Sequence, residues 1–318
     1  MIFKDFLVTE DDEQRRLDKV LSCIFPKKHE PFAKLLRKKL IKVNDKKAEP
    51  SIRLSRGDKI SIASFLLTPD EYKSTSDSQD ESSIDIETIF ENEHLKVINK
   101  PYGINVQPSK DSDIDLSSLM QKKDSITPSL SFKTGALHRL DKNTTGILVF
   151  SRSLKGARWF SKNIQDHTIR KTYIGIVSGR LNDKALWKDN LQSNISDTGF
   201  HTVRVSAVGQ EAVTQAAPLC YGIYKGREVT LVQFDIPTGR KHQIRCQSSF
   251  HGYPLLGDKA YGSQLTDRKQ EFYLHAIRMT FPKDNEAGLP SEIKAPLPQA
   301  FSQMLRECLI NWNSELII

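Results

Sequence analysis

The sequence lacks several features that would place it in a common functional class. It has no apolar run approaching the ~20 residues of a membrane-spanning helix. Neither G-x-G-x-x-G nor G-x-x-x-x-G-K-S/T occurs, which disfavours dinucleotide and P-loop chemistry. The first residues, MIFKDFLVTEDDEQRR, lack the apolar region of a signal peptide and the acid-poor composition of a transit peptide. We therefore expect a cytoplasmic protein with no membrane partner.

Cysteine is scarce, and its four residues lie far apart in the chain: Cys23, Cys220, Cys246 and Cys308. No C-x-x-C pair occurs, which argues against a zinc site or a disulfide framework and fits a reducing compartment. The formal net charge of +8 is compatible with a phosphate-rich partner. Charge alone does not decide this, because many basic proteins bind no nucleic acid.

The length of 318 residues is enough for about two domains, and one segment divides the chain. Residues 69–90 begin with proline, are rich in serine and carry seven acids against one lysine. Such a composition predicts a mobile linker of low hydrophobicity. We therefore predict a small domain over residues 1–68, a linker over 69–85 and a larger domain over 86–318.

The small domain is basic in its second half, where residues 31–60 hold ten Lys or Arg against three acids. Its apolar residues recur at helical intervals: Phe32, Leu35, Leu36 and Leu40. Short strands are expected at 41–43 and 59–62, after this helix. The cations could follow a phosphate backbone, or they could form a solvated helix face. We favour nucleic-acid binding, through four residues: Lys34, Arg37, Lys38 and Lys42.

The larger domain alternates short strand patterns with helical ones. Strands are predicted at 94–98, 147–150, 171–177, 229–236 and 275–281. Helices are predicted at 153–165 and 240–250. Because these do not follow a regular β-α-β order, we predict an α+β fold with a mixed, mainly antiparallel sheet.

The stretch HRLDKNTTG, residues 138–146, places Asp141 among charged and polar residues just before an apolar strand. A calcium loop is disfavoured, because the twelfth position is Arg152 rather than a bidentate glutamate. A carboxylate that accepts backbone N–H groups in a turn accounts for the pattern as well as a catalytic acid does.

Two further stretches carry candidate site residues. In residues 235–262, Thr238 could cap a helix bearing Arg240, His242, Gln243 and Arg245, and the start of such a helix would attract an anion. A basic, solvated first turn is the alternative, and we favour a site. Tyr173 lies in the apolar strand RKTYIGIVSG, where a core tyrosine with a satisfied hydroxyl is the commoner case.

Together these segments resemble the RluA-type pseudouridine synthases. Five motifs follow in the family's order: KPYGINVQPS (100–109), HRLDKNTTG (138–146), KTYIGIVSG (171–179), TGRKHQIR with GYPLLGDKAYG (238–262) and LHAIRMTF (274–281). The sequence departs from the family at Cys246-Gln247-Ser248, where Val-His-Leu is usual, so a more polar helix is expected behind Arg245.

The N-terminal segments RRLDKVLSCIF and FAKLLRKKLIKVNDKKAEPSIRLSRGDKISI resemble the alpha-L RNA-binding domain of the ribosomal-protein S-four type. They depart from it at Lys39 and Asp45, where glycines are common. This accompanying domain narrows the resemblance to members of the RluC and RluD types, which act on large-subunit (23S) ribosomal RNA.

The resemblance implies an isomerase that flips target uridines out of RNA and converts them to pseudouridine. It would use neither cofactor nor metal, and we expect a monomer. Asp141 would be the catalytic residue and Arg245 its partner, while Tyr173 would stack on the base and help to remove the C5 proton. Arg139 would enter the RNA stack at the place that the flipped uridine leaves. Ile244 and Leu274 would form apolar walls around the flipped base. Transfer RNA as substrate, or a non-catalytic RNA-binding assembly factor, are the alternatives.

Overall fold

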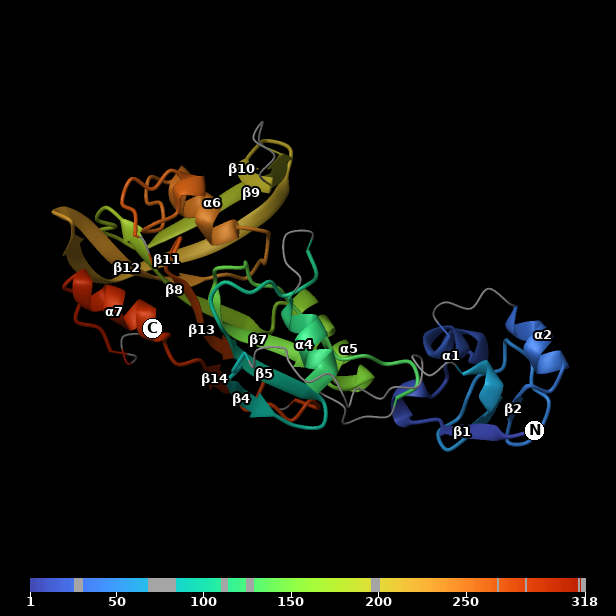
Figure 1. Ribbon diagram of the computed structural model, residues 1–318. Helices are drawn as coiled ribbons and strands as arrows, with labels where there is room; N and C mark the ends of the chain where they lie inside the picture. Colours follow the sequence, from blue (N-terminus) through green and yellow to red (C-terminus); the bar gives the residue numbers. More distant parts are fainter. Residues whose placement is uncertain are drawn as a thin grey trace.

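The computed structural model describes residues 1–25, 31–67, 84–109, 114–123, 129–195, 201–267, 269–283, 285–313 and 315. These residues form a three-stranded sheet, β1-β3-β2, and an eleven-stranded sheet. The three-stranded sheet and its helices lie at one end of the molecule (Figure 1). Of the predicted linker over 69–85, only residues 84 and 85 are described, so the domain boundaries stay a prediction.

The N-terminal part contains the predicted helix and two strands, and it also has a strand, β1, and a helix, α1, that the pattern did not predict. Its strands and helices are β1 (Phe3–Leu7), α1 (Leu17–Ile24), α2 (Phe32–Arg37), β2 (Ile41–Val43) and β3 (Lys59–Ala63). Leu35 and Leu36 are buried in its core, as the helical spacing predicted. Leu40 also packs against this core, but it follows the helix instead of extending it.

Lys39 and Asp45, where the N-terminal sequence departs from the domains it resembles, have a glycine-like backbone. Their φ angles are +59° and +63°, in the left-handed region. Asn44 has a φ of +50°, so residues 44 and 45 form a tight two-residue turn between Val43 and Lys46. A left-handed residue with a Cβ costs roughly 1–2 kcal/mol. The two turns therefore adopt the backbone conformation that glycine would allow, and the side chains at these positions reduce the stability of the fold.

The large sheet contains the predicted strands and is mixed, as the sequence indicated. Its order is β10-β9-β11-β12-β8-β13-β7-β5-β4, with β14 beside β13 and β6 beside β7. The pair β13–β7 is parallel and the other pairs are antiparallel. The strands are β4 (Thr88–Glu91), β5 (Leu95–Lys100), β6 (Gly135–Ala136), β7 (Thr145–Ser151), β8 (Arg170–Ser178), β9 (Ala185–Ile195), β10 (His201–Val205), β11 (Gln210–Tyr224), β12 (Arg227–Asp235), β13 (Leu274–Thr280) and β14 (Glu292–Lys294).

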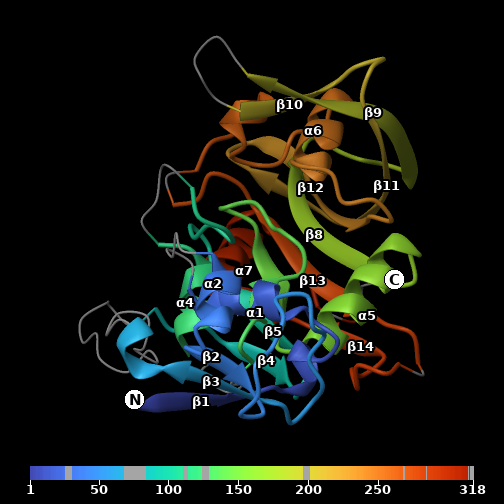
Figure 2. The ribbon, with the colours of Figure 1, turned by 90° about the vertical axis from the view of Figure 1, so that its right-hand side faces the viewer.

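Helices cover both faces of this sheet, which explains why β8 is buried from Lys171 to Val177. Successive side chains of a strand point to opposite faces, so Tyr173 joins one apolar core and Ile174 joins the other. The helices are α4 (Leu116–Lys123), α5 (Leu154–Gln165), α6 (Gln243–Phe250) and α7 (Gln299–Glu307). Helix α6 lies over β9, β10 and β11 (Figure 2), and α7 packs on the second core. No helix in the described ranges is long and apolar enough to cross a membrane.

Two acids of the N-terminal segment join it to the larger part of the chain. Asp12 is fully buried and accepts hydrogen bonds from the backbone N–H groups of Leu130 and Ser131, both at 3.0 Å. Asp11 accepts from the backbone N–H of Leu154, at the start of α5, at 2.7 Å. The contact between the two parts thus includes buried, directional hydrogen bonds.

Candidate active site

The loop that carries Asp141 is fixed by the strands around it. Asp141 comes four residues before β7, and Gly146 of that strand approaches β13 so closely that a Cβ would lie 2.3 Å from the carbonyl oxygen of Ala276. Lys100, fully buried at the end of β5, donates from Nζ to the carbonyl of Lys142 at 2.8 Å. Among the described residues, no backbone N–H donates to the Asp141 carboxylate. Its oxygens face side chains instead, which disagrees with a purely turn-stabilising role.

Arg245, on α6, is held beside Asp141 by other groups. Its Nη1 lies 3.6 Å from Asp141 Oδ2, while Nε and Nη2 donate to the two oxygens of Asp258 at 2.7 and 2.9 Å. Its guanidinium carbon lies 4.9 Å from the ring centre of Tyr261 and 4.3 Å from that of Phe272. Burial would lower the pKa of Arg245, but the hydrogen bonds and charge of Asp258 and the charge of Asp141 raise it. The arginine is therefore charged and rigidly placed, with one edge turned to Asp141.

His242 faces the other oxygen of Asp141 and is neutral at ordinary pH. Its Nε2 lies 3.8 Å from Asp141 Oδ1, and its Nδ1 lies 2.8 Å from the hydroxyl of Tyr261. Burial is the main cause that lowers the pKa of His242 to about 4, although the charge of Asp141 acts in the opposite direction. The proximity of the two residues is therefore not an ion pair at neutral pH. Because the Tyr261 oxygen accepts from Val203 N–H at 3.0 Å, its own hydrogen can point to Nδ1, leaving the Nε2 hydrogen toward Asp141.

Tyr173 lies on β8 in the same hollow as Asp141. It is buried, and burial together with the charge of Asp141 raises the pKa of its phenol well above the ordinary value. The hydroxyl is therefore protonated at neutral pH. All six candidates from the larger domain line one hollow of about 50 Å³: Arg139, Asp141, Tyr173, Ile244, Arg245 and Leu274. This hollow adjoins a larger one of about 350 Å³ that Arg139, Asp141 and Tyr173 also line.

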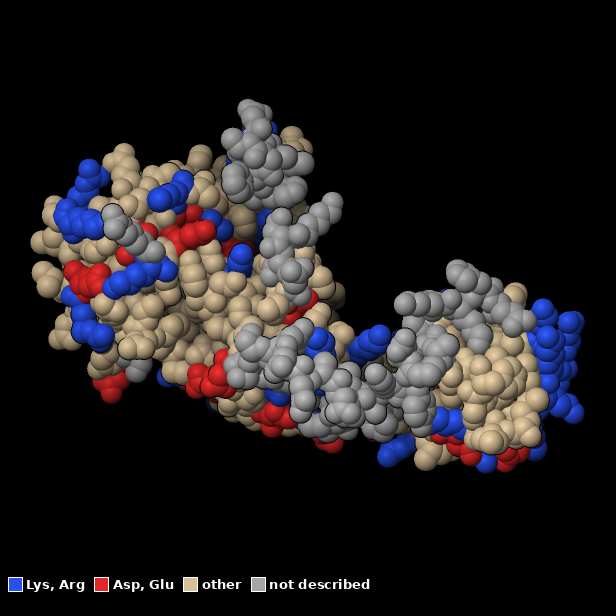
Figure 3. Space-filling model, in the orientation of Figure 1, with Lys and Arg blue, Asp and Glu red and all other residues tan. Residues whose placement is uncertain are grey.

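The four N-terminal candidates lie elsewhere. Lys34 and Arg37 are on α2, Lys38 is its C-cap and Lys42 is on β2. Blue side chains cover the α2 end of the molecule, far from the larger sheet (Figure 3). Lys42 is half-buried, with Nζ 4.5 Å from the ring centre of Phe3, whereas the other three are exposed. They form a second basic surface, separate from Asp141.

The prediction that Thr238 caps a helix carrying Arg240 and His242 is wrong. Helix α6 begins at Gln243, and its N-cap is His242 with a φ of +50°. The hydroxyl of Thr238 accepts instead from the Val213 N–H of β11, at 2.9 Å. This bond ties the 237–242 loop to the sheet, and residues 237–242 form bends and turns where the start of a helix was expected. The same loop brings Arg240 and Lys241 to the mouth of the hollow.

The polar residues of α6 that depart from the resembled family are all partnered. Gln247 is fully buried; its Oε1 accepts from Thr214 Oγ1 at 2.7 Å, and its Nε2 donates to Asp189 at 2.6 Å. Ser248 donates to the carbonyl of Arg245 at 3.2 Å. A satisfied polar network of this kind holds a helix in one position, and here it supports Arg245.

Several residues around Asp141 were missed by the sequence analysis. Asp258 and Tyr261 lie within GDKAYG, which was noted as a motif, but nothing in the spacing indicated that they hold Arg245. Lys171 is two residues before Tyr173, so strand alternation places both on one face of β8. No group of His, Cys, Asp or Glu in the described ranges is arranged to hold a metal ion.

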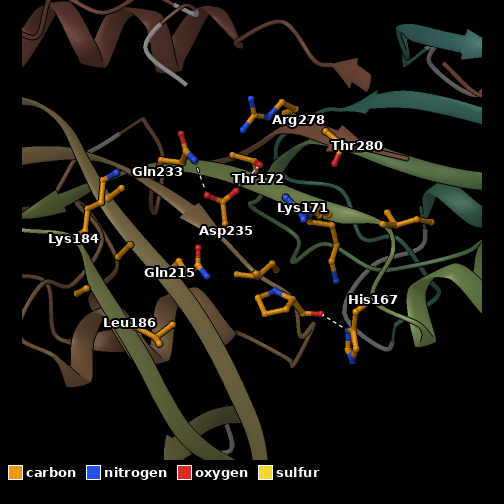
Figure 4. Close-up of a pocket in the computed structure, with 17 residues that line it drawn as sticks. His167, Lys171, Thr172, Lys184, Leu186, Gln215, Gln233, Asp235, Arg278 and Thr280 are labelled. Atoms are coloured by element: carbon orange, nitrogen blue, oxygen red, sulfur yellow. Dashed lines mark hydrogen bonds between the residues drawn. The ribbon is translucent and has the colours of Figure 1, made fainter. Parts of the chain in front are cut away.

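A hollow larger than the two that Asp141 lines lies beside them. It has a volume of about 880 Å³, and its carboxylate, Asp235, accepts from Thr172 and Gln233 at 2.6 Å each. Figure 4 shows this network in the middle of the hollow, with Lys184 and Leu186 at one end and His167 at the other. Because its acid is already engaged, the smaller hollow is the better candidate for chemistry. The two adjoin at Lys171 and Pro237, which line both.

Comparisons with known proteins agree on one family. Residues 94–250 match the family model described as RNA pseudouridylate synthase. An uncharacterised RNA pseudouridine synthase of Mycoplasma genitalium is 29% identical over 91% of this chain and 92% of its own length. The ribosomal large subunit pseudouridine synthase C of Rickettsia felis is 30% identical over 92% of this chain and 96% of its own.

The fold also matches a solved structure. Human RNA pseudouridylate synthase domain containing 4 superposes with a TM-score of 0.56 and 22% identity, covering 71% of this chain and 94% of the human one. At this identity the match supports the architecture of the large sheet, and it agrees with the α+β class predicted from the sequence.

Proposed function

We propose that this chain, which belongs to the RNA pseudouridylate synthase family and is a pseudouridine synthase, modifies uridines of large-subunit ribosomal RNA. Two observations support this substrate. The relatives that match along nearly the whole chain include large-subunit enzymes of the C type. The chain also carries a basic N-terminal surface, with Lys34, Arg37 and Lys38 exposed on or beside α2.

The reaction breaks the N1–C1′ bond of uridine, turns the base and joins C5 to C1′. The C5 hydrogen leaves as a proton and N1 gains one, so atoms and electrons balance without an oxidant or reductant. A carboxylate can act as nucleophile or as base in such a sequence. We assign this role to Asp141, because it lies in the hollow with one oxygen 3.6 Å from the guanidinium of Arg245. This juxtaposition is the observation that carries the proposal.

The remaining residues of the hollow have roles in holding a flipped base. Tyr173 is buried and neutral, so it can stack on uracil and take part in removing the C5 proton. Ile244 and Leu274 would be apolar walls, and exposed Arg139 would fill the gap in the RNA stack. Extruding a base costs a few kcal/mol, which such contacts can offset.

The N-terminal sheet and its helices would act as an RNA-binding domain of the S-four type. Its lysines and arginines are solvent-facing, which suits contacts with a phosphate backbone. Deleting residues 1–68 should weaken affinity for ribosomal RNA and reduce the slope of log affinity against log salt. An unchanged slope would remove this role from the domain.

The substrate is tested by tritium release. Purified protein is incubated with unmodified, C5-tritiated large-subunit ribosomal RNA, and tritium in water is measured; unmodified transfer RNA is run in parallel. We expect release from ribosomal RNA. Release from transfer RNA alone would leave the chemistry intact and overturn the substrate.

The role of Arg245 is tested by Arg245→Met. Turnover should fall far more than RNA affinity, because the guanidinium faces Asp141 and is mostly buried. Equal losses in turnover and affinity would make Arg245 a general phosphate contact instead.

A further inference from the structure

Lys171 is a buried cation without a partner in the described part of the chain. Its residue is 8% exposed, and no described carboxylate or other acceptor lies within hydrogen-bonding distance of its Nζ. Its neighbours are cationic or neutral: the charge of Arg240 acts on it, and its own charge acts on His138. Burial, and to a lesser degree the charge of Arg240, lower the pKa of Lys171, because both make the charged form less favourable than it is in water.

Such an arrangement costs folding stability. An ammonium that loses most of its contact with water and gains no hydrogen bond within the protein is unfavourable, and replacement by an apolar side chain of similar size is commonly neutral or stabilising. Lys100, a second buried lysine, differs from Lys171 because its Nζ donates to two backbone carbonyls. An unpaired charge in a hollow is therefore a candidate for ligand binding.

The hollow around Lys171 has the charge and size to hold an anion. It is lined by four cationic side chains, Arg139, Lys171, Arg240 and Lys241, and by one acid, Asp141. Its volume of about 350 Å³ lies near the lower end of the ~300–1,000 Å³ found for ligand sites. Gly239 closes one side, and a Cβ there would come within 3.2 Å of Lys171 Nζ. The glycine leaves the ammonium accessible from the mouth of the hollow.

We propose that Lys171 binds a backbone phosphate of the RNA strand that carries the target uridine, next to the flipped nucleotide. This inference rests on the proposed function and adds a phosphate subsite to it. Lys171 and Tyr173 are two residues apart and lie on the same face of β8. The phosphate bound by Lys171 would therefore lie next to the base stacked on Tyr173. Arg240 and Lys241 flank the subsite from the loop above.

Phosphate fits the site better than the carbonyl oxygens of uracil do. A neutral base would need one donor and would not compensate several cations. A phosphate carries a full negative charge and accepts several charge-assisted hydrogen bonds, which offset the desolvation of Lys171. The cost of the unpaired lysine in the free protein is then recovered on RNA binding.

Three variants test the subsite. Lys171→Met removes the charge at nearly constant volume, and Lys171→Arg keeps it. Lys269→Met is the matched control, because Lys269 is exposed, pairs with Glu307 at 3.0 Å and does not line the hollow. Each is assayed on an RNA fragment that wild type converts, for kcat, KM, salt dependence of affinity and thermal stability.

We expect Lys171→Met to raise KM about tenfold or more, as loss of a charge-assisted hydrogen bond would, with kcat little changed. The salt slope should fall by about 0.7, the value for one phosphate of a single strand. Its melting temperature should equal or exceed that of wild type. Lys171→Arg should retain most affinity, and Lys269→Met should leave KM and kcat unchanged.

A second measurement locates the phosphate. Methylphosphonate, which is uncharged, replaces one phosphate at a time around the target uridine. One position should weaken binding to wild type and have no further effect on Lys171→Met. Absence of such a position, or a fall in kcat with unchanged KM and salt slope in Lys171→Met, would overturn the subsite. Failure of wild type to convert any RNA would instead refute the proposed function, while the binding comparison could still be made.

Discussion

The pair Arg245–Asp258 is the main support of the candidate site, and its removal gives the sharpest prediction. Asp258 is 1% exposed and Arg245 is 7% exposed, with two hydrogen bonds of 2.7 and 2.9 Å between them. Asp258→Asn keeps the shape, removes the charge and turns an N–H₂ group toward the guanidinium. Breaking a buried pair in this way costs about 3–5 kcal/mol. Asp141, 3.6 Å from Arg245, can compensate in part, so we expect a loss of about 3 kcal/mol.

The same change should also reduce activity. Without Asp258, the guanidinium is free to turn toward Asp141 and bind its carboxylate directly, which takes up the lone pairs needed for reaction. The free energy of unfolding is measured by urea titration, and turnover by tritium release. A lower midpoint with an unchanged m-value would report a loss of stability alone.

A double variant separates the two effects. Arg245→Met with Asp258→Leu replaces the charges by apolar groups of similar volume, and it should be more stable than Asp258→Asn but inactive. An Asp258→Asn protein with wild-type stability and turnover would refute the argument that Asp258 holds Arg245 in place.

Three further predictions concern other parts of the chain. Burial would raise the pKa of Asp12, but its hydrogen bonds lower it below the ~3.9 of an unfolded chain, so its stabilisation is complete above pH ~4 and is lost as pH falls through the folded pKa. The melting-temperature difference between wild type and Asp12→Asn should shrink below that pH; a constant difference would contradict this. Lys39→Gly should raise the free energy of unfolding by about 0.5–1 kcal/mol, as left-handed strain exceeds the entropy of glycine, and a loss in urea titration would refute it. In thiol titration at pH 8, exposed Cys23 should react first, while Cys246 and Cys308, whose pKa values burial raises to about 11 and about 12, should react only on unfolding.

Local patterns predicted the strands β5, β7, β8, β12 and β13 of the larger sheet, because these are mostly apolar runs between turns, but they did not predict β9, β10 and β11. The strand 147–150 and the helix 153–165 were found within a few residues of their bounds, and Ser153 caps that helix by accepting from Gly156 N–H at 3.0 Å. The position of Asp141 before a buried strand was also visible. These features are determined by residues that are close together in the sequence, and local sequence patterns can therefore predict them.

Long-range contacts were not predictable in this way. Thr238 had the sequence position of a helix cap, but its hydroxyl bonds to Val213, 25 residues away, and the helix begins only at Gln243. Asp258 is 13 residues from Arg245 and meets it only after an intervening turn. The sequence could not predict that Lys171 has no hydrogen-bond partner among the described residues. The burial of Lys171 and the residues around it depend on the contact between β8 and the 237–242 loop.

The central claim is that Asp141 performs the isomerisation, and its most direct test is one substitution. Asp141→Asn keeps the size of the side chain and removes its nucleophilic and basic oxygen pair. Wild type and variant are compared for tritium release from C5-tritiated large-subunit ribosomal RNA in a single turnover, with enzyme in excess and RNA binding measured in the same samples. The account predicts release by wild type and none above background by the variant, with RNA still bound. Release by Asp141→Asn at the wild-type rate would contradict it.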